Sequence, residues 1–131
     1  MDRFRQISID TRVAVALGAA LGTGLRAGLH EVVVATATTA LWATLAANVT
    51  GSLLLGLLLG WRLRRSHPST FTIPFFGIGL LGSFTTFSLF AVETSELLRT
   101  GRAGMAAAYS IGSVGGGFIA ARIGEQTGRG L

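Results

Sequence analysis

The sequence predicts an all-α membrane protein with four transmembrane helices and a break in the third. Half of its residues are hydrophobic, only 13% are charged, and the mean hydropathy is positive. Four segments also reach the length of about 20 mostly apolar residues that a helix needs to span a bilayer. We therefore expect one helical transmembrane domain over residues 1–131.

The expected spans are residues 13–29, 39–61, 71–92 and 103–121. The short connections at 30–31, 62–69 and 99–102 carry charged and turn-forming residues typical of a membrane interface, and they leave no room for a soluble domain. Arginines followed by an apolar run at the N-terminus also fit a secretory signal peptide. Because the run continues past residues 18–20, we expect a retained first span instead.

Residues 82–90, with the sequence GSFTTFSLF, interrupt the third span. They place one glycine, four hydroxyl side chains and three phenylalanines in an otherwise apolar stretch. An unpaired backbone N–H or C=O costs several kcal/mol in lipid, so such a break persists only where it is buried in protein or lines a cavity. This segment is therefore the first candidate for the functional site.

Composition argues against an enzyme or a metal centre of the zinc or di-iron kind. The chain has no cysteine, two isolated histidines and six scattered acidic residues, which leaves no cluster of suitable ligands. All eleven basic residues are arginine. They lie at the predicted membrane edges, where positive charge meets anionic headgroups, and we expect no nucleic-acid partner.

The distribution of arginine predicts the orientation of the chain. With four spans both termini share one side, and the positive-inside rule places the more basic side in the cytoplasm. Eight arginines fall on the side of the termini and three on the other, which predicts cytoplasmic termini. The eight are Arg3, Arg5, Arg12, Arg62, Arg64, Arg65, Arg122 and Arg129, and the three are Arg26, Arg99 and Arg102.

Glycines recur at four-residue spacing in the predicted helices, at 18 and 22, 24 and 28, 56 and 60, and 112 and 116. This spacing lets helix backbones approach closely. Each pair serves either packing within the chain or contact between subunits. Because a four-helix chain of this size has little interior, glycine faces on nearly every helix indicate an oligomer.

Polar side chains also form stripes inside two spans. Asn48 lies near the middle of the second span with Thr44 and Ser52 one turn to either side, so the three share a face. Tyr109 and Ser113 share a face of the fourth span in the same way. These groups either join helices by hydrogen bonds or offer donors to an anion that moves along them, and a serine can also bond to its own helix.

Other residues near the break have two interpretations each. Phe87 and Phe90 place their rings on one side of the third span, where rings usually only pack, although their positive edges can touch a small anion. Gly82 can free backbone carbonyls for a monovalent cation such as Na⁺. Arg26 either snorkels to headgroups or attracts anions at a pore mouth. Glu93 is expected to pair with an arginine or to cap a helix.

Three segments resemble the signature segments of the Fluc family of fluoride channels, also called CrcB. They are GTGLR at residues 22–26, NVTGSLLLG at 48–56 and GSFTTFSLFAVE at 82–93. Their order and spacing are similar to the family over essentially the whole chain. The resemblance implies a fluoride-selective channel of the inner (plasma) membrane that passively exports fluoride and so relieves fluoride toxicity.

The resemblance further implies an antiparallel dual-topology dimer with two pores at the subunit interface and a structural Na⁺ held by backbone carbonyls, at Gly82 and Thr85. Three positions depart from the family: Leu89 and Gly117 stand where hydroxyl side chains are common, and Thr23 stands where alanine often follows the glycine. By resemblance, the fluoride pore would comprise Asn48, Phe87, Phe90, Ser88, Tyr109 and Ser113, with Arg26 at the vestibule.

Several alternatives stay open at this point. The unequal arginine counts favour a single orientation, so a heterodimer with an oppositely oriented homologue stands beside a homodimer. A small proton-coupled multidrug transporter also has four short helices and dual topology, but it needs a carboxylate within the membrane, and the predicted spans contain no acid before Glu93. The remaining alternative is a structural membrane subunit, in which the polar stripes only join helices.

Overall fold

The computed structural model describes residues 9–33, 37–65 and 69–131. Every regular element in these ranges is helical. Four helical stretches, Ile9–Val33, Thr39–Leu63, Ile73–Arg99 and Ala103–Gly130, are long and apolar enough to cross a membrane. The predicted all-α fold with four membrane-spanning stretches is confirmed, and each stretch runs further toward the C-terminus than predicted. The elements are α1 (Ile9–Val33), α2 (Ala37–Leu63), η1 (Ile73–Leu81), α3 (Gly82–Phe84), α4 (Phe87–Arg99) and α5 (Ala103–Gly130).

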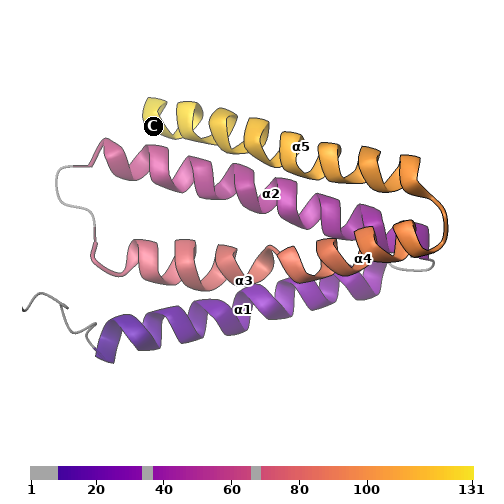
Figure 1. Ribbon diagram of the computed structural model, residues 1–131. Helices are drawn as coiled ribbons and strands as arrows, with labels where there is room; N and C mark the ends of the chain where they lie inside the picture. Colours follow the sequence, from indigo (N-terminus) through magenta and orange to yellow (C-terminus); the bar gives the residue numbers. More distant parts are fainter. Residues whose placement is uncertain (1–8, 34–36, 66–68) are drawn as a thin grey trace, which may run out of the picture.

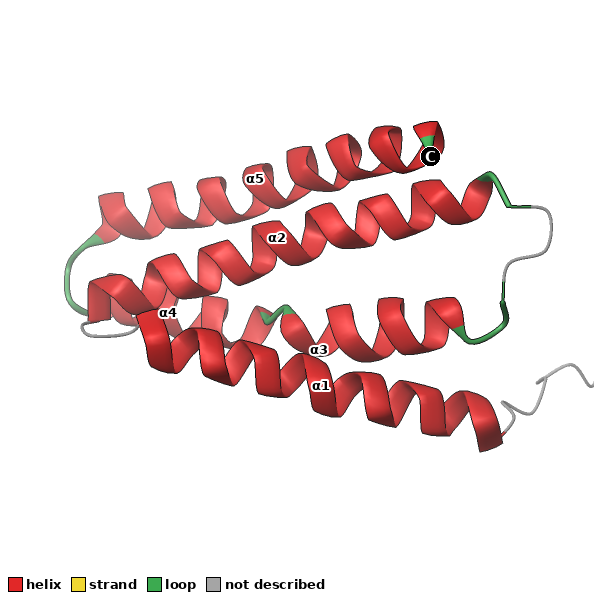
Figure 2. Cartoon of the chain, turned by 180° about the vertical axis from the view of Figure 1, so that it is seen from behind, coloured by secondary structure: helices red, strands yellow, loops and turns green. Residues whose placement is uncertain are grey.

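The spans alternate in direction, so that the start of α1 and the end of α5 lie at the same end of the molecule (Figures 1 and 2). α2 and α5 run side by side in the same direction, and α1 lies along η1 and α3. The shared end carries the arginines that follow α2 and those of the last turns of α5. Arg3 and Arg5, which contributed to the predicted orientation, lie outside the described residues.

Glycines bring the paired helices into backbone contact. A Cβ atom added at Gly22 of α1 would lie 2.1 Å from the carbonyl oxygen of Leu80, and one added at Gly56 of α2 would lie 2.1 Å from that of Ala121. Two of the predicted glycine pairs therefore pack inside the chain. At Gly24 and Gly28 of α1, by contrast, an added Cβ would meet no atom within 4 Å in the part of the chain that the structure describes.

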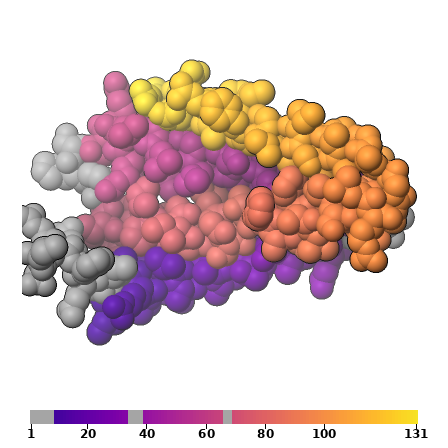
Figure 3. All heavy atoms as spheres, viewed as in Figure 1, coloured from indigo at the N-terminus to yellow at the C-terminus, as the bar shows by residue number. Residues whose placement is uncertain are grey.

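The interior of the chain is small. Its buried apolar side chains are mostly alanines, with Leu81, Leu97 and Tyr109 the larger ones. Figure 3 shows atoms of all four spans on a single face of the molecule. Long apolar side chains at Leu17 and Leu21 of α1 are more than half exposed, as expected for surfaces that face lipid or another subunit rather than water.

The first part of the third span is a π-helix, in which backbone hydrogen bonds join residues five apart. This element, η1, has Pro74 in its first turn, and the N–H of Gly82 donates to the carbonyl of Gly77 at its end. The wider turn lets Gly79 face α1, where its Cβ position would lie 2.6 Å from the carbonyl oxygen of Val15. The hydrophobic pattern predicted a helix here but not its π geometry.

Candidate functional site

The helical path of the third span is interrupted between α3 and α4. α3 ends at Phe84, and α4 begins at Phe87. Between them Thr85 and Thr86 are extended, with φ/ψ of −77°/157° and −146°/122°. Extended residues within a membrane-spanning stretch need protein partners for their backbone groups, because lipid offers none.

Asn48 of α2 supplies these partners to Thr86. Its Oδ1 accepts the Thr86 N–H at 2.8 Å, and its Nδ2 donates to the Thr86 carbonyl oxygen at 3.0 Å. Because Thr86 presents one donor and one acceptor, the pair of bonds fixes which way the amide faces. One amide N–H of Asn48 remains for another acceptor.

The side chain of Thr86 caps α4 and changes the bonding of the residues before it. Its Oγ1 accepts the N–H of Leu89 at 3.2 Å and lies 3.1 Å from the Oγ of Ser88. In a continuous helix the N–H of Thr86 would bond to the carbonyl of Gly82, and that of Leu89 to the carbonyl of Thr85. Both N–H groups are used elsewhere, so these two carbonyls lose their helical donors.

Thr85 directs its own donors back along α3. Its N–H and its Oγ1 both donate to the carbonyl oxygen of Leu81, at 3.1 and 3.0 Å. Its methyl group faces Gly51 of α2, where an added Cβ would lie 2.3 Å from Thr85 Cγ2. The hydroxyl proton of Thr85 is therefore used within the third span, whereas its carbonyl has no helical donor.

An open cleft of about 300 Å³ adjoins the break, with walls from α2, α4 and α5 and from the end of η1. No ionisable side chain lines it. The structure thus brings together most of the site residues that the sequence predicted. Those that line the cleft are Asn48, Gly82, Thr85, Phe87, Phe90 and Ser113.

Aromatic rings form a row beside this cleft. Phe87 is 79% exposed, and its ring centroid lies 5.7 Å from that of Phe90, at 45° between the ring planes. Phe90 in turn lies 5.5 Å from Tyr109 of α5, at 40°. The exposed ring of Phe87 therefore has only one side packed within the described chain.

Ser113 of α5 is among the residues that line the cleft. Its side chain is buried, and its Oγ has no hydrogen-bond partner among the residues that the structure describes. A buried donor without a partner is costly in a membrane, so this hydroxyl is suited to a polar ligand in the cleft.

Glu93 has partners that the sequence interpretation missed. Its two carboxylate oxygens accept hydrogen bonds from Thr44 Oγ1 at 2.8 Å and from Tyr109 Oη at 2.6 Å. The expectation that Glu93 pairs with an arginine or caps a helix is wrong, because the cap of α4 is Thr86 and both oxygens face hydroxyls. The polar stripes on α2 and α5 were visible in the sequence, but their meeting at this carboxylate was not.

Three predicted site residues lie outside the lining of the cleft. Tyr109 gives its only O–H to Glu93, and Ser88 is exposed and close to Thr86. Arg26 of α1 is half-buried, and its Nε donates to the carbonyl of Ser83 at 3.2 Å, just before the break. The guanidinium thus reaches α3, and Arg26 also lines a surface crevice with His30.

The comparison with known families agrees with the sequence resemblance. The family model described as "CrcB-like protein, Camphor Resistance (CrcB)" matches residues 13–125, which is most of the chain. The chain belongs to the CrcB family. Membership was predicted from three segments, and each of them lies within the matched region.

Curated relatives of this CrcB-family chain are named as fluoride-specific ion channels. The FluC of Novosphingobium aromaticivorans is 43% identical over 69% of this chain and 71% of its own length. The FluC of Deinococcus radiodurans is 46% identical over 66% and 68%, and FluC 3 of Streptomyces avermitilis is 43% identical over 66% and 42%. Because the relatives are named as channels, the prediction that the protein is not an enzyme is confirmed.

Proposed function

We propose that this CrcB-family protein is a fluoride-selective channel that lets fluoride leave the cell passively. The observation that carries the proposal is the cleft beside the break, whose lining combines neutral donors and aromatic rings without any ionisable side chain. An anion path needs groups that replace water, whereas a proton-coupled carrier needs a titratable one. The names of the curated relatives support the choice of fluoride.

The cleft supplies the kinds of contact that a small dehydrated anion requires. Asn48 retains one amide N–H, and Ser113 retains its O–H. The rings of Phe87 and Phe90 offer positive edges on the same cleft. At a membrane potential that is negative inside, an anion is driven outward by about 2.3 kcal/mol per 100 mV, which gives passive flow the direction of export.

The open cleft and the exposed ring of Phe87 support a second subunit as the missing wall. In an antiparallel dual-topology dimer, each subunit would complete the path of the other. The arginines at the shared end of α2 and α5 favour one orientation of a single chain, so a heterodimer with an oppositely oriented homologue is included in the proposal beside a homodimer.

A structural Na⁺ is the remaining part of the proposal. The carbonyls of Gly82 and Thr85 lack helical donors, and carbonyl oxygens without a nearby carboxylate suit a monovalent cation. Arg26 already occupies the carbonyl of Ser83, which leaves these two as the fitting pair. When bound there, the ion would supply a fixed positive charge beside the cleft.

Two alternatives lose support in this arrangement. A proton-coupled drug transporter needs a carboxylate in its path, but Glu93 accepts hydrogen bonds from Thr44 and Tyr109 and does not line the cleft. A purely structural subunit does not require an open cleft lined by neutral donors and aromatic rings.

Efflux from liposomes tests the function. The purified protein is reconstituted with fluoride or chloride inside, and the released anion is followed with a selective electrode. We expect fluoride efflux and far slower chloride efflux. The variant Phe87→Ile should abolish the fluoride efflux. Phe76→Ile is the matched control, because Phe76 is also an exposed ring, at 49%, but lies on η1 away from the cleft.

The outcomes of this assay decide each part of the proposal. Absence of fluoride efflux from the chain, both alone and with an oppositely oriented homologue, would refute the channel. Activity that appears only with the homologue would support the heterodimer, whereas full activity of the single chain would exclude it.

Replacing Na⁺ with a bulky organic cation during purification should reduce fluoride efflux without changing the fold, and undiminished efflux would remove the structural Na⁺ from the proposal.

A further inference from the structure

A second crevice lies between α2 and α5, near the end of the molecule where both helices finish. Its volume is about 490 Å³. Leu55 and Leu59 of α2 and Phe118 of α5 form its apolar part, and Arg62 and Arg122 stand at its polar part. No residue of this crevice except Leu55 also lines the cleft beside the break, so the two are different sites.

Arg62 carries a charge that the described chain leaves without compensation. Its Nη1 is buried and has no hydrogen-bond partner among the residues that the structure describes. A buried charged donor without a partner costs more than a neutral one, because it loses water without gaining an acceptor. An anionic acceptor in the crevice would therefore stabilise the guanidinium of Arg62.

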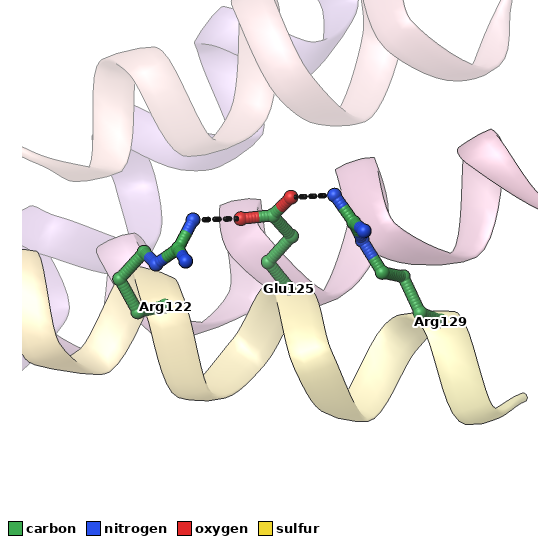
Figure 4. Close-up of polar contacts among 3 residues, drawn as sticks. All are labelled: Arg122, Glu125 and Arg129. Carbon is green, nitrogen blue, oxygen red and sulfur yellow. Dashed lines mark hydrogen bonds and ion pairs between the residues drawn. The ribbon is translucent and has the colours of Figure 1, made fainter.

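The nearby carboxylate is already occupied. Glu125 accepts from Arg122 at 3.2 Å and also pairs with Arg129, and Figure 4 shows the two guanidinium groups reaching its two oxygens from either side. This carboxylate thus pairs with two arginines, and Arg62 has no ion-pair partner among the described residues. The crevice and its rim keep a positive excess, which Arg64 increases at the end of α2.

The shape of the crevice matches the two parts of a lipid. The two helices are in backbone contact within the crevice, where an added Cβ at Gly56 would lie 2.1 Å from the carbonyl oxygen of Ala121. Leucine and phenylalanine side chains line the part nearer the middle of the spans, and arginines lie nearer the end. Trp61, with Arg65 4.9 Å from its ring centroid, marks the level of the headgroups.

We propose that this crevice binds an anionic phospholipid of the leaflet at this end of the molecule. The headgroup phosphate would accept hydrogen bonds from Arg62 and Arg122, and an acyl chain would lie along Leu55, Leu59 and Phe118. Basic pockets between transmembrane helices are suited to such headgroups. The site does not depend on fluoride conduction, and its test does not use it.

Lipid binding to the purified protein in detergent tests the site. Native mass spectrometry would count bound phosphatidylglycerol and phosphatidylcholine of identical acyl chains, and thermal unfolding would follow their effect on stability. We expect the anionic lipid to bind and to raise the unfolding midpoint. Loss of one charged hydrogen-bonding group in Arg62→Gln should weaken its binding about tenfold. Arg99→Gln is the control, since Arg99 is exposed at the opposite end.

A second variant and a second probe keep the result decisive. Leu59→Trp fills the apolar part and leaves every charge in place, so it should also reduce binding of the anionic lipid. Equal binding of the two lipids, or unchanged binding in both variants, would overturn the proposal. Stabilisation by inorganic phosphate alone to the same extent would show a free-anion site instead, and a change from dimer to monomer in Arg62→Gln without loss of lipid would show a subunit contact.

Discussion

The side-chain amide of Asn48 pairs with both backbone groups of Thr86, at 2.8 and 3.0 Å. The two residues come from different spans, so this contact attaches the break in the third span to α2. It also frees the carbonyl of Gly82 and sets the start of α4, from which Phe87 and Phe90 project. The proposed cation site and the aromatic row therefore depend on the same amide.

Replacing this amide should remove function and stability together. Asn48→Ala leaves the N–H and C=O of Thr86 without partners, at about 1–3 kcal/mol for each group. We expect a clear fall in the unfolding midpoint and loss of fluoride efflux. Asn48→Asp keeps an acceptor for the Thr86 N–H but places a second carboxylate oxygen, instead of a donor, against the Thr86 carbonyl oxygen. This variant should therefore also lose fluoride efflux. Thr50→Ala, at an exposed position of the same helix, should behave like the unchanged protein. Normal efflux from Asn48→Ala would contradict this role.

Two glycines of α1 should respond oppositely to the same substitution. In Gly22→Ala the new Cβ would lie 2.1 Å from the backbone oxygen of Leu80, which no rotamer change can relieve, so α1 must separate from η1. Gly24→Ala meets no atom within 4 Å in the described chain and should gain up to about 1 kcal/mol of helix propensity. We expect thermal unfolding in detergent to show a destabilised Gly22→Ala and an unchanged or stabilised Gly24→Ala.

The oligomeric state provides the second measurement for this pair. If Gly24→Ala stays folded but becomes monomeric, the open glycine face of α1 is a subunit contact. If both variants unfold at the same temperature, the close packing of α1 on η1 does not limit stability, and the prediction is wrong.

The number of spans could be predicted because apolar length is a local property of the sequence. The location of the cleft followed from polar residues at positions where lipid tolerates few, such as Asn48 and Ser113. The π geometry of η1 could not be predicted, because it accompanies a backbone contact between Gly79 and α1 that is far away in sequence. The partners of Glu93 were missed for a similar reason: hydropathy indicates which residues are polar, but not which of them meet.

The contact between Tyr109 and Glu93 should show a strong pairwise coupling. Tyr109→Phe leaves the carboxylate with Thr44 as its one remaining hydroxyl donor in the described chain, and a hydrogen bond to a charged group contributes about 1.5–3 kcal/mol. A double-mutant cycle of Tyr109→Phe and Glu93→Gln should therefore give a coupling free energy above about 1 kcal/mol. The same cycle with Glu96→Gln should give none, because Glu96 is exposed.

Efflux measurements on the same variants separate a structural contact from a conducting one. If Tyr109 only holds α4 against α5, a variant that remains folded should keep its selectivity for fluoride over chloride. Altered selectivity in a fully folded Tyr109→Phe would instead show that the phenol contacts the anion, as the sequence resemblance implied.

Arg26 should act on anion entry through its charge, and salt should reveal it. The Debye length falls from about 30 Å at 0.01 M salt to about 3 Å at 1 M, so attraction of fluoride by a fixed charge is strong only at low salt. We expect Arg26→Gln to reduce fluoride efflux severalfold at low ionic strength and little at high. Arg102→Gln is the control for a general surface effect, because Arg102 is exposed and precedes α5. A loss of efflux in Arg26→Gln that is equal at all salt concentrations would show that the bond from Arg26 to the Ser83 carbonyl, rather than the charge, is what the channel needs.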